Sequence, residues 1–150
     1  MKLLHLLIGT SGRIGRGQFW LSALILVIAF LVVITGALLF TSSLDDMLRV
    51  DFVAYFFVLL SLPVGLKRLH DRNKPNWWLF VFYGIPLGLF IVPFLIDSET
   101  DATPVAVAIL QFAGMAVLLW ALVELGFLRG TIGANDHGPD PVAPKLAKRD

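Results

Sequence analysis

Cysteine is absent from this 150-residue chain, and charged residues are few, at 15% of the total. Without cysteine the chain has no disulfide, no zinc–thiolate site and no cysteine nucleophile. A soluble domain carries about 25% charged residues, whereas here 57% of the residues are hydrophobic. Because those residues stand in long uninterrupted runs and the mean hydropathy is +0.82, the composition excludes an ordinary soluble fold. It indicates a single integral membrane domain.

Four apolar segments predict an all-α integral membrane fold with four transmembrane helices, near residues 19–40, 52–69, 77–96 and 105–124. Crossing a bilayer takes about 20 apolar residues, and the second run is shorter because it ends at Leu66. It can cross if its helix continues through Lys67 and Arg68, whose long stems can lie along the acyl chains while their charges reach the head groups. The alternative is a re-entrant or buried second segment.

The basic residues predict the orientation, because positive charge stays on the cytoplasmic side. The loop between the third and fourth segments, residues 97–104, carries acidic residues and no basic one. All basic residues except Arg49 fall on the other side: Lys2, Arg13, Arg16, Lys67, Arg68, Arg72, Lys74, Arg129, Lys145, Lys148 and Arg149. We therefore expect both termini in the cytoplasm. We expect residues 1–18 to be an interfacial segment rather than a signal peptide, and residues 129–150 to be a cytoplasmic tail that is partly disordered.

The polar loop between the second and third segments concentrates most of the reactive side chains. On a continuing helix Arg68 and Asp71 are three positions apart and share a face. The plainest interpretation is a charge network that closes the helix end, with His70 bonded to a backbone carbonyl. A second interpretation is a phosphate or lipid head-group site, with Asp71 orienting an arginine among Arg13, Arg16, Arg68 and Arg72, since the arginine fork binds two phosphate oxygens. Trp77 and Trp78 follow as interface anchors.

Catalysis, metal binding and transport have weaker signals. His70 and Asp71 could form the acid–base pair of an enzyme acting on a lipid phosphate, but adjacent helical residues point about 100° apart. His70 and His137 could share a metal only if the fold brought them together, so no metal and no cofactor is expected. Transport, as a small oligomeric transporter or channel, is a further alternative. Glu124 is the one carboxylate near a span, and we expect it to be paired with a base. No basic module supports nucleic-acid binding.

The third segment contains Gly84 and Gly88, four residues apart, with Pro86 and Pro93 interrupting the helix. Small residues at this spacing let another helix approach closely. The helix could pack within the bundle as a kinked element. The same stripe could instead be a homo-oligomer seam.

Three stretches together resemble the bacterial inner-membrane proteins of domain-of-unknown-function family 805. They are residues 12–20 with Arg13 and Arg16 before Phe19 and Trp20, the Arg68-Leu69-His70-Asp71 loop before Trp77 and Trp78, and residues 133–141 with Asn135 before Gly138 and Pro139. The resemblance implies a helical fold, an inner-membrane location and a meeting of the three motifs, and it implies no activity. Two departures are Pro75-Asn76 where the family commonly has Ser-Gly, and His137 where it commonly has an aromatic residue.

We therefore predict a non-enzymatic, multi-pass inner-membrane protein with an accessory role. Its expected partners are the lipid bilayer, anionic lipid and a membrane protein or second copy of the chain. The expected site is a cytoplasmic-face cluster of Arg13, Arg16, Arg68, His70, Asp71, Arg72, Trp77, Trp78 and Asn135.

Overall fold

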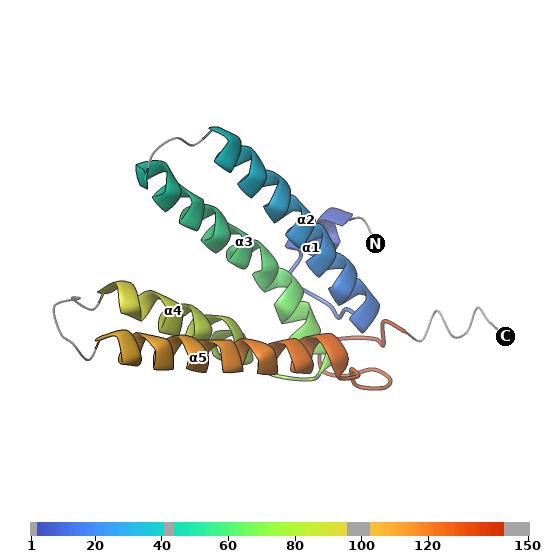
Figure 1. Cartoon of the computed structure of the whole chain (residues 1–150). Coiled ribbons are helices and arrows are strands. Elements are labelled where there is room, and N and C mark those ends of the chain that lie inside the picture. The colour runs from blue at the N-terminus through green and yellow to red at the C-terminus, as the bar shows by residue number, and fades with distance from the viewer. Residues whose placement is uncertain (1–2, 41–43, 96–102, 143–150) are drawn as a thin grey trace.

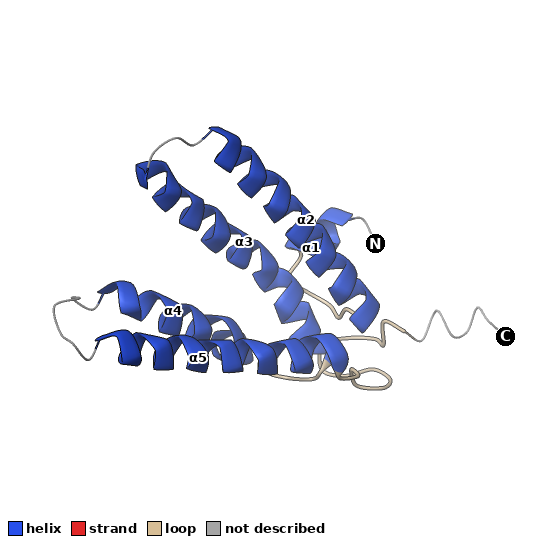
Figure 2. Cartoon of the chain, in the orientation of Figure 1, coloured by secondary structure: helices blue, strands red, loops and turns tan. Residues whose placement is uncertain are grey.

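The computed structural model describes residues 3–40, 44–95 and 103–142, and within these ranges it is helical with no strand (Figure 2). In chain order the elements are α1 (Leu3–Ile8), α2 (Arg16–Phe40), α3 (Leu44–Asp71), the π-helix η1 (Phe80–Gly84), α4 (Ile85–Leu95), α5 (Thr103–Leu122) and the π-helix η2 (Val123–Phe127). The predicted all-α class is confirmed for these residues. Most of the predicted loop 97–104 and the end of the tail, predicted to be disordered, lie outside the described residues.

Two helical hairpins make up the molecule: α2 packs along α3, and α4 packs along α5. The hairpins meet where α3 and η2 end, and they diverge from that shared end (Figure 1). Short α1 packs on α3 and α2. The buried apolar core lies at the shared end, formed by Leu6, Ile14, Phe19, Val64, Leu69, Phe82, Ala121 and Leu125. Away from it the hairpins mostly expose apolar side chains, as lipid-facing helices do.

Among the described residues, three helices are long and apolar enough to cross a membrane: Arg16–Ala37, Val53–Asp71 and Pro104–Phe127. A fourth apolar helix, Phe80–Val92, is shorter. The predicted continuation of the second segment is confirmed, because α3 runs unbroken through Lys67 and Arg68 to Asp71. The shorter apolar helix belongs to the third segment, which is helical from Trp78, one residue after the predicted start. It begins with tight turns, since the amides of Trp78, Leu79 and Phe80 each bond the carbonyl three residues earlier.

The end of α3 explains where this turn begins. Asn73 has a positive φ of 52°, a conformation that Asn tolerates better than most residues. Its amide bonds the carbonyl of His70, and the amide of Lys74 bonds the carbonyl of Leu69. This is the Schellman pattern that closes a helix around a left-handed residue. The polar loop therefore leaves α3 at a fixed angle.

Prolines and glycines shape the third segment. Before Pro86 the backbone widens into η1, where the amide of Ile85 bonds the carbonyl of Phe80 five residues back. Proline has no amide hydrogen for the ordinary bond, and a π-turn at this point accommodates its absence. A Cβ atom at Gly84 would lie 2.6 Å from the Phe80 ring, whereas Gly88 faces open space. The homo-oligomer seam through Gly84 and Gly88 stays a prediction.

A close approach also joins the hairpins. A Cβ atom at Gly65 of α3 would lie 2.6 Å from the hydroxyl oxygen of Tyr83 in η1. Only a residue without a side chain leaves room for that ring. Gly65 therefore allows α3 and η1 to pack at the shared end.

Candidate functional site

Six ionisable side chains are buried together near the shared end, and we call them the buried ionic cluster. Its members are Arg13, Lys67, Arg68, His70, Asp71 and Glu124, each at most 8% exposed. Among the described residues no buried side-chain nitrogen or oxygen lacks a hydrogen-bond partner. Burying a charge is costly unless it is paired and fully hydrogen-bonded. The partners therefore show what the cluster holds together.

Asp71, at the end of α3, is the centre of the cluster. Its Oδ1 accepts a hydrogen bond from Nε of Arg13 at 3.2 Å and lies 3.1 Å from Nη2 of the same guanidinium as an ion pair. Its Oδ2 accepts one from Nη1 of Arg68. Both carboxylate oxygens are thus engaged by arginines, one from the loop before α2 and one from α3 itself. Removing one partner of a buried ion pair typically costs about 3–5 kcal/mol, because the other charge stays buried.

Arg13 ties this carboxylate to the tail, residues 128–142. Its Nη1 donates to the carbonyl oxygens of Gly133 (2.7 Å) and Gly138 (3.0 Å). Its Nη2 donates to the carbonyl oxygen and the hydroxyl of Thr131, at 2.6 and 3.1 Å. A guanidinium has five N–H donors, and with Asp71 all five are directed at protein acceptors. Arg13 therefore has no donor left for a ligand.

Arg68 caps the end of η2. Its Nε donates to the carbonyl of Leu125 (2.6 Å) and its Nη2 to the carbonyl of Leu128. Its Nη1 also lies 3.4 Å from the carbonyl of Ile14. The last carbonyls of a helix lack partners within the helix, and a basic side chain can bond them and offset the negative end of the helix dipole. Arg68 supplies both the hydrogen bonds and the positive charge, and it is fully buried.

Arg72 and Lys74 bind Glu124, whose carboxylate is 8% exposed within η2. Oε1 of Glu124 lies 2.9 Å from Nη2 of Arg72 and 3.4 Å from Nζ of Lys74. Nη1 of Arg72 also donates to the carbonyl of Arg129. The expected pairing of Glu124 with a base is thus made by the loop after α3.

Lys67 performs the same capping at α1. Its fully buried Nζ donates to the carbonyls of His5 (2.9 Å) and Leu6, at the last turn of α1. The segment before α2 is thereby fastened to α3. Nothing in the sequence pattern pointed to this contact, because a lysine at a membrane boundary is ordinarily an anchor at the head groups.

The tail lies against Asp71. The amide and the hydroxyl of Thr131 donate to the backbone carbonyl of Asp71, at 2.8 and 3.0 Å. A Cβ atom at Gly130 would lie 2.0 Å from Oδ2 of the same residue, so position 130 accepts only glycine. Gly130 and Thr131 were missed at the sequence level, since neither residue type carries a signal for such a contact.

His70 and His137 stack with ring centroids 4.0 Å apart and planes 5° apart. The Nδ1 of His70 faces the Gly12 carbonyl oxygen at 3.2 Å, and Nε2 faces Oδ1 of Asn76 at 2.8 Å. The side-chain amide of Asn135 donates to the backbone carbonyl of His70 at 2.9 Å. The structure thus brings together parts of all three sequence motifs, with Arg13, Arg68, His70, Asp71 and Asn135 in direct contact with one another or with shared partners.

The remaining predicted site residues lie outside this contact network. Arg16 is exposed at the start of α2, with Nη1 3.3 Å from the Phe127 carbonyl. Trp77 is 59% exposed and stacks on Trp78 at 4.9 Å. Lys74 Nζ lies 3.8 Å above the Trp78 ring. The tryptophans thus form a separate aromatic group at the start of η1.

This geometry limits the chemistry of the cluster. The carboxylate of Asp71 bonds arginines, and the ring of His70 bonds Gly12 and Asn76, so the two do not face each other as an acid–base pair. No group of three or more His, Cys, Asp or Glu side chains could hold a metal ion within the described residues. The cluster is arranged to bind one part of the chain to another.

His137 makes the docking of the tail sensitive to pH. Burial in the stack, together with nearby His70 and Arg13, holds the pKa of His137 below its ordinary value, against the opposing pull of Asp136. Folding therefore favours neutral His137. Its pKa is about 6.5 when the tail is free, so docking is undisturbed above that pH and weakens as the pH falls below it.

We expect hydrogen–deuterium exchange of residues 130–142, corrected for intrinsic rates, to be slow at pH 7.5 and clearly faster at pH 5.5. His137→Gln should remove most of this difference. His5→Gln, at an exposed histidine of α1, is the matched control and should keep it. Equal protection of the wild-type tail at both pH values would contradict the role assigned to His137.

Comparison with known proteins identifies a family and several relatives that the chain resembles. The family model described as "Protein of unknown function (DUF805)" matches residues 7–139. The uncharacterized protein YiiR of Escherichia coli K12 is 30% identical over 146 residues, covering 93% of this chain and 90% of the relative. The inner membrane proteins YhaI and YhaH of the same organism are each 24% identical, covering 94% of this chain and 92% and 93% of their own lengths.

The names of YhaI and YhaH and the three helices able to cross a bilayer confirm the predicted inner-membrane location. No solved structure matches the chain with significance. The family model covers most of the chain, including the first two motifs, residues 133–139 of the third and every residue of the buried ionic cluster. The chain therefore belongs to the DUF805 family of proteins of unknown function.

Proposed function

We propose that this protein is a four-span, non-enzymatic membrane protein with both termini in the cytoplasm. The buried ionic cluster fastens its two hairpins at the cytoplasmic end, and the exposed residues around the cluster bind anionic lipid. The observation that carries this proposal is the full engagement of Asp71, Arg13 and Arg68 by protein groups. A cluster with its donors and acceptors so engaged stabilises the fold, and ligand binding is left to the exposed residues around it. We call these residues the rim: Arg16, Trp20, Trp77 and Arg129.

The distribution of charge supports the four-span topology. The described basic residues outside the first turns of α3 gather at the shared end: Arg13, Arg16, Lys67, Arg68, Arg72, Lys74 and Arg129. That concentration is retained in the cytoplasm. The third segment is helical from Trp78 to Leu95, or about 27 Å at 1.5 Å per residue. This is close to the hydrocarbon thickness of about 30 Å, a mismatch that local thinning accommodates.

Fusions at two points test the topology. A cytoplasmic reporter joined after Asp150 should be active and a periplasmic reporter silent. Insertion into the 97–104 loop should give the reverse. An active periplasmic reporter at the C-terminus would contradict the orientation.

Two alternatives have less support. An enzyme built on His70 and Asp71 would need those groups free to exchange protons with a substrate, and each already bonds protein partners. A transporter would need ionisable groups along a path through the membrane. Among the described residues, Lys67 and Glu124 lie near the ends of their spans, and both are bonded at the shared end.

The rim of the shared end is suited to an anionic membrane surface. Arg16 and Arg129 are exposed, and each basic residue near such a surface contributes about 1 kcal/mol of attraction. Trp77 is exposed at the start of η1, and Trp20 donates from Nε1 to the Gly126 carbonyl at 3.0 Å near the end of η2. Indole rings prefer this interfacial depth. The rim therefore lies at the level of the head groups.

Intact-complex mass spectrometry of the protein in mild detergent tests lipid binding. With phosphatidylglycerol and phosphatidylcholine added in equal amounts, we expect adducts with the anionic lipid to predominate severalfold. Bare protein alone, or equal retention of the two lipids, would overturn the proposal of an anionic-lipid-binding role.

A further inference from the structure

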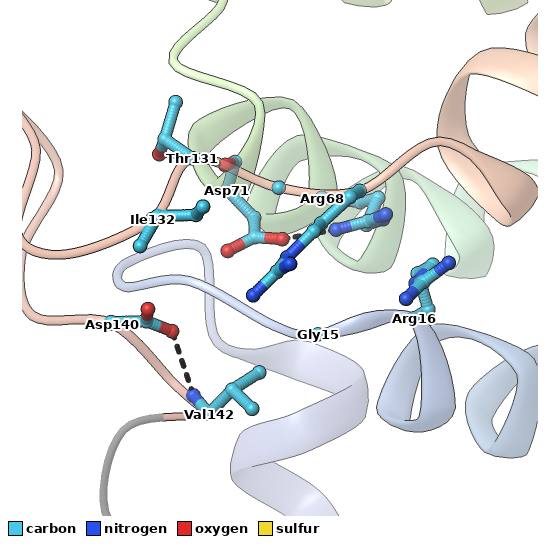
Figure 3. Close-up of a pocket in the computed structure, with 10 residues that line it drawn as sticks. Gly15, Arg16, Arg68, Asp71, Thr131, Ile132, Asp140 and Val142 are labelled. Carbon is cyan, nitrogen blue, oxygen red and sulfur yellow. Dashed lines mark hydrogen bonds and ion pairs between the residues drawn. The ribbon is translucent and has the colours of Figure 1, made fainter.

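A cavity of about 120 Å³ borders the buried ionic cluster, between the start of α2, the end of α3 and the tail. Figure 3 shows Arg16 on one side of it and Asp140 with Val142 on the other, with Asp71 and Arg68 between them. Arg129, Gly130, Thr131 and Ile132 complete the lining with Gly15. Such a volume holds several water-sized groups, and therefore the oxygens of one phosphate.

The charges that line this cavity are unequally engaged. Asp71 bonds Arg13 and Arg68. Asp140 accepts hydrogen bonds from the amides of Gly133 (3.0 Å) and Val142 (2.8 Å). Both carboxylates are thus held by hydrogen-bond donors of the protein.

The two arginines at the mouth of the cavity, Arg16 and Arg129, make fewer contacts with protein groups. Arg16 is exposed and makes one long hydrogen bond, to the Phe127 carbonyl. The side chain of Arg129 is exposed and makes no ion pair with another described residue. The lining thus carries three arginines against two carboxylates. The excess positive charge lies on arginine, the side chain best suited to bind two phosphate oxygens at once.

The position of the cavity relative to the membrane surface indicates which phosphate compound it binds. Arg16 is the first residue of α2, and Arg129 follows the last turn of η2, so both stand where two membrane-spanning helices leave the apolar region. Trp20, one turn further into α2, packs edge-on against Phe127 with ring centroids 5.4 Å apart. An indole at that position marks the interface, and the cavity lies just outside it, where lipid phosphates lie.

We infer that this cavity binds a phosphate group through Arg16 and Arg129, as the head-group phosphate of an anionic lipid. The inference rests on the proposed lipid-binding function and names the site for it. It also moves the site away from Arg13 and Arg68, whose donors are engaged by the protein, and adds Arg129. A soluble phosphate compound presents the same chemistry, so the test separates the two sources.

The test compares variants of the full chain in mild detergent. Phosphatidylglycerol is titrated and followed by intact-complex mass spectrometry, and inorganic phosphate is titrated and followed by the thermal unfolding temperature. Arg16→Gln with Arg129→Gln should weaken lipid affinity about 25-fold, since each arginine contributes roughly fivefold. Arg16→Lys with Arg129→Lys keeps the charge but loses the fork, and should fall in between. Lys148→Gln with Arg149→Gln, the matched control, removes the same amount of charge from residues outside the proposed site. It should change affinity less than about twofold if the site, and not net charge, holds the lipid.

The outcomes separate the two proposals. If wild-type protein retains phosphatidylglycerol and the double glutamine variant retains it equally, the site is wrong while lipid binding stands. If wild-type protein retains no lipid, the proposed function fails. Stabilisation by inorganic phosphate that depends on Arg16 and Arg129 would then assign the cavity to a soluble phosphate. A cavity that responds to neither probe overturns the inference. Both arginines are exposed, so the unfolding temperature without ligand should be unchanged in the variants.

Discussion

Asp71 accepts hydrogen bonds from Arg13 and Arg68 in a site from which water is nearly excluded. The loop before α2, the end of α3 and the tail all depend on this one carboxylate, because Arg13 reaches the tail carbonyls and Arg68 reaches the end of η2. Without Asp71, two buried guanidinium groups would lie together without their counter-charge. Apolar packing between the hairpins is confined to the shared end, since the hairpins diverge beyond it (Figure 1).

Helix ends account for the excess of positive charge in the cluster. The C-terminal ends of α1, α3 and η2 all lie at the shared end, and their unpaired carbonyls carry partial negative charge. Lys67 bonds the carbonyls at the end of α1, and Arg68 and Arg72 bond carbonyls at and after η2. The same basic residues that predict orientation thus also neutralise helix ends. The residues on which the orientation prediction rests therefore also serve folding.

Much of this could be predicted from the sequence. Long apolar runs predicted the helices, and the three-residue spacing of Arg68 and Asp71 predicted their shared face. The tight turns at residues 75–80 and the π-turn before Pro86 were not predicted, because hydropathy does not register them. Arg13 was expected to meet Arg68 and Asp71, and it does. Its bonds to Thr131, Gly133 and Gly138 depend on tail backbone carbonyls. Every residue has a backbone carbonyl, so the sequence does not show which carbonyls accept hydrogen bonds from Arg13. The sequence likewise could not distinguish the arginines bonded to protein groups from the outer pair, Arg16 and Arg129. That distinction depends on the hydrogen bonds seen in the structure.

The central claim is that the pairing of Asp71 sets the arrangement of the two hairpins. Because the chain has no cysteine, spin labels can be attached to cysteines placed at Leu39 of α2 and Val105 of α5, both exposed and far from the shared end. The measurement is their distance distribution by pulsed electron paramagnetic resonance in lipid nanodiscs. We expect a narrow distribution in the labelled parent, a much broader one with Asp71→Asn, and no change with Asp136→Asn at an exposed tail position. A distribution equally narrow with and without the Asp71 carboxylate would contradict the account.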